Sequence, residues 1–129
     1  MSNESARTAA RLLAAGRVAL GIAVLAAPRA VTSRWLGEEN SSLPVVGDLA
    51  LSLGARDLAL GAVTLSLLDD PVMGPRAVLL CALVDGVDTI ATVIARDSLP
   101  LKGVLGTVAI AGAATIGGMC VSHRLAHPA

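Results

Sequence analysis

Residues 48–68 read DLALSLGARDLALGAVTLSLL, an apolar stretch that carries one arginine and one aspartate at its centre. The stretch has about the length that a helix needs to cross roughly 30 Å of hydrocarbon, which takes about 20 residues. A charge at the centre of a bilayer costs roughly 2.5–3.5 kcal/mol on insertion scales, so Arg56 and Asp57 are expected to face a protein interior and to pair there. The stretch therefore predicts a membrane-spanning helix with one polar, protein-facing side.

Three further apolar segments of similar length flank this one, and each is bounded by proline or by charged turns. They cover residues 6–27, 76–95 and 103–121. With residues 48–68 they predict an all-α fold, an integral membrane four-helix bundle in up-down order, as a single transmembrane domain over residues 1–129.

The first segment has a competing interpretation. Three arginines precede a short apolar run within residues 6–27, as in a secretory signal. Pro28 directly after Ala27 makes a poor cleavage site, so we favour a membrane span.

Composition agrees with a membrane setting. Apolar residues make up 54% of the chain and charged residues only 16%, below the roughly 25% of ordinary globular domains. Phe and Tyr are absent, so the apolar volume comes from Ala, Leu, Val and Gly, which suit close helix packing in lipid. The formal net charge is zero and no basic run occurs, which argues against nucleic-acid binding.

A short interfacial helix is predicted after the first span, over residues 28–37, PRAVTSRWLG. Proline favours the first turn of a helix and glycine favours its end. Arg29, Arg34 and Trp35 would anchor this helix in the headgroup layer, and a specific lipid site there is the alternative. Residues 38–42 are expected to form a solvated loop.

Five charged side chains lie near the midpoints of the first three spans: Arg17, Arg56, Asp57, Asp85 and Asp88. Two positive and three negative groups leave one excess negative charge, so one carboxylate, in the Asp85 and Asp88 pair, is expected to hold a proton near neutral pH. The cluster is interpreted either as a structural ion-pair network or as a proton or ion site.

Residues three or four apart share a face of a helix, and several such stripes are small or polar. They are Ala10, Ala14, Arg17 and Gly21 in the first span, Gly47, Gly54, Asp57 and Gly61 in the second, Cys81, Asp85, Asp88 and Thr92 in the third, and Ala109, Ala113 and Gly117 in the fourth. If these stripes are the packing faces, the charges converge inside the bundle.

The octapeptide GARDLALG at residues 54–61 resembles a family of small four-helix bacterial membrane proteins of uncharacterised function, loosely DoxX-like. The resemblance extends to residues 16–21 with Pro28, to residues 35–37, and to Asp85 and Asp88. It implies the four-span topology and a polar core, and it implies nothing about a substrate.

No catalytic site, cofactor or metal site is predicted. The sequence contains no discernible Ser-His-Asp or Cys-His set, and His123 and His127 lack a third ligand and are expected to lie in a frayed polar tail. An enzyme is therefore not expected.

We expect a non-enzymatic membrane protein, structural or accessory to a larger assembly. The alternative is a small proton- or ion-coupled transporter that acts as an oligomer. The partners expected are the lipid bilayer and further copies or a larger membrane complex. The expected location is the cell membrane, with multiple passes and with both termini in the cytoplasm, because the N-terminus is basic.

Overall fold

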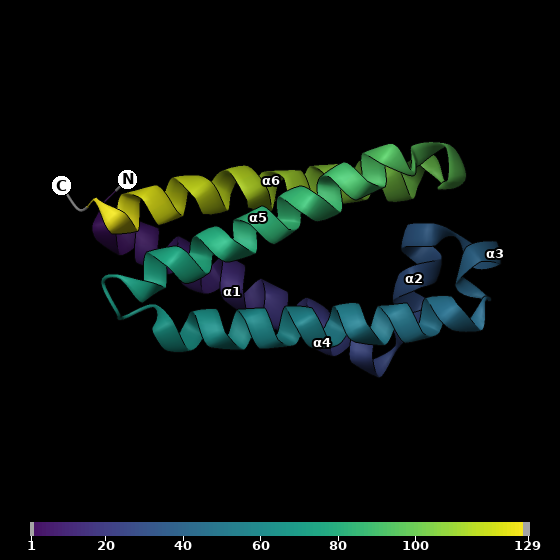
Figure 1. The fold of residues 1–129 in the computed structure, drawn as a ribbon, viewed down its shortest axis with the longest axis horizontal. Coiled ribbons are helices and arrows are strands. Elements are labelled where there is room, and N and C mark those ends of the chain that lie inside the picture. Colours follow the sequence, from purple (N-terminus) through teal and green to yellow (C-terminus); the bar gives the residue numbers. More distant parts are fainter. Residues whose placement is uncertain (1, 128–129) are drawn as a thin grey trace.

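Helices account for nearly all of the chain in the computed structural model, which describes residues 2–127 (Figure 1). Four long helices alternate in direction, so the two ends of the chain lie at the same end of the bundle. The elements in order are α1 (Asn3–Ala26), α2 (Pro28–Leu36), α3 (Glu38–Ser41), α4 (Pro44–Leu67), α5 (Met73–Ile94), the 3-10 turn η1 (Arg96–Ser98) and α6 (Leu101–Ala126). No strand occurs among the described residues. The predicted all-α, up-down bundle with a short helix after the first span is confirmed.

Local sequence explains where the first helices begin and end. The Ser2 hydroxyl accepts a hydrogen bond from the backbone N–H of Ser5 at 3.1 Å and so caps α1. Pro28 occupies the first turn of α2, where its missing N–H costs nothing. Gly37 ends α2 with a φ of +86°, a backbone conformation that side chains disfavour.

The four predicted spans are all present, but two boundary predictions are wrong. Residues 38–42 do not form a simple loop, because residues 38–41 make a helical turn closed by the Ser42 N–H on the Glu38 carbonyl at 3.1 Å. The last helix does not fray after residue 121 but continues to Ala126. It continues because Ser122 donates to the Pro75 carbonyl at 2.7 Å and Val121 is buried against α5 and its neighbours.

The distribution of side chains is the reverse of that in a soluble domain. Small residues fill the interior: Ala6, Ala10, Ala14, Ala50, Ala77 and Ala82 are all buried. Large apolar side chains point outward, among them Ile94, which is 78% exposed, and Ile110, which is 74% exposed. All four long helices are long and apolar enough to cross a membrane, and the surface they present is one that lipid would cover. The chain is therefore a multi-pass membrane protein.

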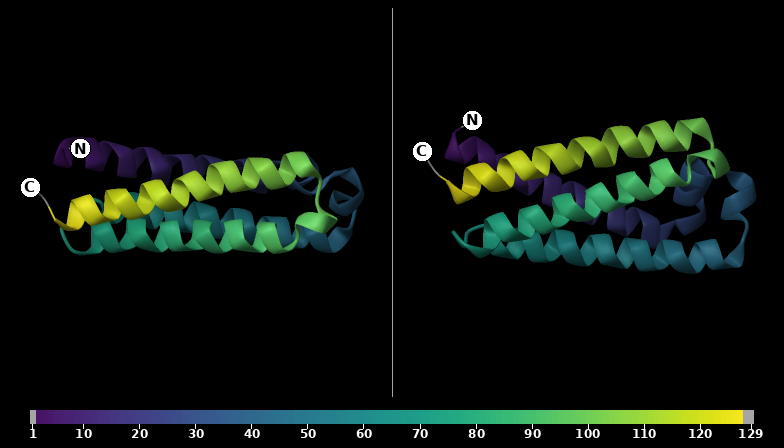
Figure 2. Two further views of the ribbon diagram at one scale, coloured as in Figure 1. Left: turned by 90° about the horizontal axis from the view of Figure 1, so that it is seen from above. Right: turned by 45° about the horizontal axis from the view of Figure 1, so that its top comes forward.

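The bundle is built from two closely packed helix pairs. Helix α1 packs along α4 and α5 packs along α6, while the contacts between the pairs are fewer (Figure 2). In the first pair the backbones touch: a Cβ added at Gly21 would lie 2.5 Å from the Leu58 nitrogen, and one added at Gly61 would lie 2.8 Å from the Ala14 carbonyl oxygen. Glycine is thus required at both positions.

The two pairs are close at one end of the bundle and diverge toward the other. Figures 1 and 2 show α4 and α5 joined by a tight turn near the termini and separating toward α2 and α3. The close end is filled by an apolar cluster of Ala10, Leu68, Val78 and Val121. The divergent end leaves room for a cavity between the pairs.

Candidate functional site

Arg17 lies at the middle of α1 and links both helix pairs. Its Nη1 donates to Asp57 Oδ1 of α4 at 2.7 Å, and its Nη2 donates to Asp85 Oδ1 and, at 3.3 Å, to the Cys81 carbonyl of α5. Arg17 is only 9% exposed. A guanidinium has five N–H donors in a fixed fork, so it can satisfy several acceptors from different helices at once.

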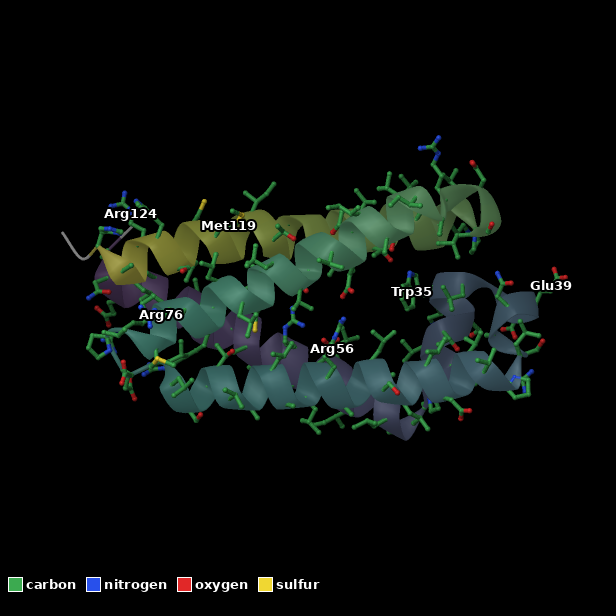
Figure 3. All side chains as sticks on the ribbon, in the orientation of Figure 1. Trp35, Glu39, Arg56, Arg76, Met119 and Arg124 are labelled. Carbon is green, nitrogen blue, oxygen red and sulfur yellow. The ribbon has the colours of Figure 1, made fainter. Side chains whose placement is uncertain are left out.

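Arg56 forms the second link, from α4 to α5. Its Nη1 and Nη2 donate to the two carboxylate oxygens of Asp88 at 3.2 and 2.7 Å, a bidentate pair, and Nη2 also reaches Asp57 Oδ1 at 3.1 Å. Figure 3 shows the Arg56 side chain rising from α4 toward α5. The side chains of Arg56 and Asp88 are 33% and 30% exposed, so this pair is much more open than Arg17.

Asp57 joins the two links into one network because a single oxygen, Oδ1, accepts from both arginines. The structure thus brings together all five residues that the sequence placed at mid-span. We name Arg17, Arg56, Asp57, Asp85 and Asp88 the charge network. Its three carboxylates and two guanidiniums leave one excess negative charge when all are ionised.

Small-residue stripes support this arrangement in part. Ala10, Ala14, Arg17 and Gly21 are all buried, as is the stripe of α4 from Gly54 through Asp57 to Gly61. At Gly47, however, an added Cβ would meet nothing within 4 Å, so the glycine contact begins only at Gly54, about two turns further along α4 than the spacing of the glycines suggested.

The stripe in the fourth span does not pack inside the bundle. Ala109 and Ala113 are exposed, and a Cβ at Gly117 would lie in open space. Helix α6 instead packs through Gly118, where an added Cβ would lie 2.9 Å from the Ala82 Cβ. The one-residue difference shows that α6 turns a different face to α5 than the spacing of its small residues suggested.

A cavity of about 680 Å³ lies between the helix pairs, and the charge network forms part of its wall. The rest of the lining is mainly apolar and includes Leu13 and Leu53 together with Ile110 and Ala114. This volume is within the roughly 300–1,000 Å³ of small-molecule sites.

The predicted anchor residues take different positions. Arg29 is exposed on α2. Trp35 points into the bundle (Figure 3) and lines the cavity, and its indole Nε1 is buried with no hydrogen-bond partner among residues 2–127. Arg34 is exposed and also lines the cavity, with one donor used by the Ala30 carbonyl at 2.7 Å. An anchoring role for the three residues stays a prediction.

Sequence reasoning missed the contribution of α6 to this end of the cavity. Lys102 and Gly103 lie in its first turn, and both line the cavity. A Cβ at Gly103 would lie 1.9 Å from the Trp35 carbonyl oxygen, so α2 and α6 are in direct backbone contact here. The sequence signal was a glycine in the first turn of an apolar span, which alone does not identify its neighbour.

The remaining candidate ligands are dispersed. His123 and His127 lie at the end of α6 with ring centroids 4.6 Å apart, and the His127 Nδ1 is 3.0 Å from the His123 carbonyl oxygen. Cys81 contacts the Thr64 hydroxyl at 3.3 Å, and Cys120 is exposed. Within residues 2–127 no three His, Cys, Asp or Glu side chains are grouped as a metal site would require.

Comparisons with protein-family models, with curated proteins and with solved structures found no match to this chain.

Proposed function

We propose that the protein is a small proton- or ion-coupled carrier that works through the cavity between its two helix pairs. The observation that carries the proposal is the position of Arg56 and Asp88, which form a partly exposed ion pair in the wall of a cavity of about 680 Å³. A purely structural network would be expected to be dry throughout. Charged residues at mid-membrane that reach a cavity are typical of transport sites.

The charge balance of the network provides a coupling mechanism. One proton or one monovalent cation neutralises the excess negative charge, and its release restores it. Asp88 is the most exposed carboxylate of the network, with 30% of its side chain exposed against 18% for Asp85 and 11% for Asp57, so we propose it as the one that exchanges a proton with the cavity. Protonation of Asp88 would remove one side of the Arg56 pair and so loosen the link between α4 and α5.

The test is the dissipation of a pH gradient across proteoliposomes, followed with a trapped pH-sensitive dye. Asp88→Asn keeps the size of the side chain but cannot ionise, so it is expected to lower the rate to that of empty liposomes. The matched control is Asp97→Asn, since Asp97 is exposed in η1 beyond the spans. Wild type and Asp88→Asn both running at the background rate would end the carrier proposal.

A second candidate is an accessory protein of a membrane assembly, and one observation favours it. The outward stripe of Ala109, Ala113 and Gly117 on α6 offers the small-residue surface on which membrane helices associate. Its test is self-association in bilayers, measured by energy transfer between labelled copies or with a co-expressed partner. Ala113→Leu should abolish association, and unchanged association would reject this surface.

We further propose that the protein resides in the cell membrane with both termini in the cytoplasm. Four spans put both termini on one side, and Arg7 and Arg11 near the N-terminus favour the cytoplasmic side. Reporter fusions at each terminus test this orientation, and activity of a periplasmic reporter at either terminus would contradict it.

A further inference from the structure

The wide end of the cavity carries two cations that have no carboxylate partner, and one unpaired N–H donor, among residues 2–127. Arg34 of α2 and Lys102 of α6 both line the cavity on either side of the contact between Trp35 and Gly103. Neither cation forms a salt bridge within residues 2–127. The two together make this end of the cavity positive.

The indole N–H of Trp35 adds a neutral donor at the same place. The Nε1 atom is buried and has no acceptor among the described residues, and the Trp35 side chain lines the cavity. Leaving a buried donor unsatisfied is costly, so such groups in native proteins usually meet water or a ligand. An oxygen-rich, negatively charged group is the kind of ligand that suits two cations and an N–H donor.

The cavity wall beyond these groups is mainly apolar, and its rim faces lipid. Leu12 and Leu20 of α1 and Ile110 of α6 line the cavity although they are 69%, 48% and 74% exposed. Side chains that are exposed on a membrane span and also line a cavity mark an opening toward the bilayer. An acyl chain can therefore enter sideways between α1 and α6.

From these three features we infer that the cavity binds an anionic phospholipid. The phosphate lies at Arg34, Lys102 and the Trp35 indole, and one acyl chain lies between α1 and α6. An anionic phospholipid would then be the solute of the proposed carrier. Only the movement of the lipid rests on the carrier proposal, and its binding does not. Binding itself is measured without a gradient, so a failure of transport and a failure of binding are distinguishable.

Trp35 allows a direct test because it is the single tryptophan of the chain. Bromine quenches tryptophan fluorescence at short range, so a lipid brominated near the glycerol end of its acyl chain reports a phosphate bound beside Trp35. The protein is placed in zwitterionic phosphatidylcholine bilayers that contain a small fraction of brominated phosphatidylglycerol or, in parallel, of brominated phosphatidylcholine. We expect phosphatidylglycerol to quench Trp35 at a lower mole fraction, by about fivefold for each cation and roughly 25-fold for both.

In the double variant Arg34→Gln with Lys102→Gln, both lipids should quench Trp35 equally. In the double variant Arg34→Lys with Lys102→Arg, the preference for phosphatidylglycerol should be kept. Arg29→Gln is the matched control, because Arg29 is exposed on the same helix and does not line the cavity. Equal quenching of the wild type by both lipids would overturn the inference. Loss of the preference in Arg29→Gln to the same extent would also overturn it, since that result indicates general attraction to the membrane surface.

Discussion

Neighbouring helices are held together in opposite ways at two places in the bundle, the interface between α1 and α4 and the boundary between α4 and α5. Glycines bring α1 and α4 into backbone contact, as the close approach of Gly21 to Leu58 shows. Along most of their length α4 and α5 diverge; Arg56 of α4 crosses the space between them to Asp88, and Arg17 of α1 reaches Asp85 of α5. Close packing fixes two helices rigidly, whereas charged side chains can hold two rigid pairs together and still let one carboxylate change state.

The largest effect is expected where the link between the pairs is most deeply buried. Arg17→Met leaves Asp85 without its guanidinium, and breaking a buried pair by removing one partner costs about 3–5 kcal/mol. We expect a large loss of thermal stability in detergent, measured by circular dichroism.

The double variant Arg17→Met with Asp85→Leu should regain much of that stability, because it removes the unpaired charge as well. If Arg17→Met unfolds at the wild-type temperature, the buried link does not hold the pairs together.

The next effect is at the glycine contact of the first pair. Gly61→Ala places a methyl group 2.8 Å from the Ala14 carbonyl oxygen, and overpacking of this kind costs about 1–3 kcal/mol. Gly47→Ala is the matched control on the same helix, where a Cβ meets nothing within 4 Å. The control should be neutral or slightly more stable by the same thermal assay, and equal destabilisation by both variants would show that α1 and α4 are not in backbone contact.

A smaller effect on stability is expected at the more exposed pair of the charge network, Arg56 with Asp88. Asp88→Asn removes an ion pair whose side chains are about one-third exposed, and pairs of that exposure contribute under about 1 kcal/mol. Stability should therefore change much less than in Arg17→Met, although transport is lost. If Asp88→Asn lost as much stability as Arg17→Met, the exposed Arg56–Asp88 pair and the buried Arg17 would contribute equally to stability, contrary to this prediction.

The smallest effect concerns the turn that joins the two pairs. Backbone N–H groups of Met73 and Val72 donate to the Asp70 carboxylate at 2.8 Å and lower the pKa of Asp70 below its usual range. A carboxyl group with a lowered pKa in the folded state stabilises the fold above its unfolded pKa, about 3.9, and this stability is lost as the pH falls below that value.

Asp70→Ala should therefore lower the melting temperature slightly at pH 7 and remove part of its decline in acid. An unchanged pH profile between pH 5 and pH 2 would show that Asp70 does not stabilise the turn.

The sequence predicted the spans and the meeting of the charges because both follow from regular spacing along single helices. Arg17 and Asp57 lie on small-residue stripes, and such stripes indicate packing faces before any partner is known. The partners themselves depend on rotations between helices that a periodic pattern leaves undefined. For that reason the stripe of Ala109, Ala113 and Gly117 on α6, expected as a packing face inside the bundle, instead points outward.

The cavity could not be predicted, because it depends on two departures from regular packing. Helix α2 turns Trp35 inward and contacts Gly103 of α6, and the two pairs diverge at the same end. Neither a lone tryptophan nor a glycine in a first turn identifies the other as its neighbour. The position of Lys102 in the cavity wall was missed for the same reason, because the sequence does not show that it lines the same cavity as Arg34.

The order of the network along the chain has a consequence for synthesis. A ribosome delivers α1 and α4 first, and of the charge network these helices bring two arginines, Arg17 and Arg56, but only one aspartate, Asp57, into the membrane. The nascent half therefore carries a surplus positive charge in lipid until α5 arrives with Asp85 and Asp88, which reverse the sign.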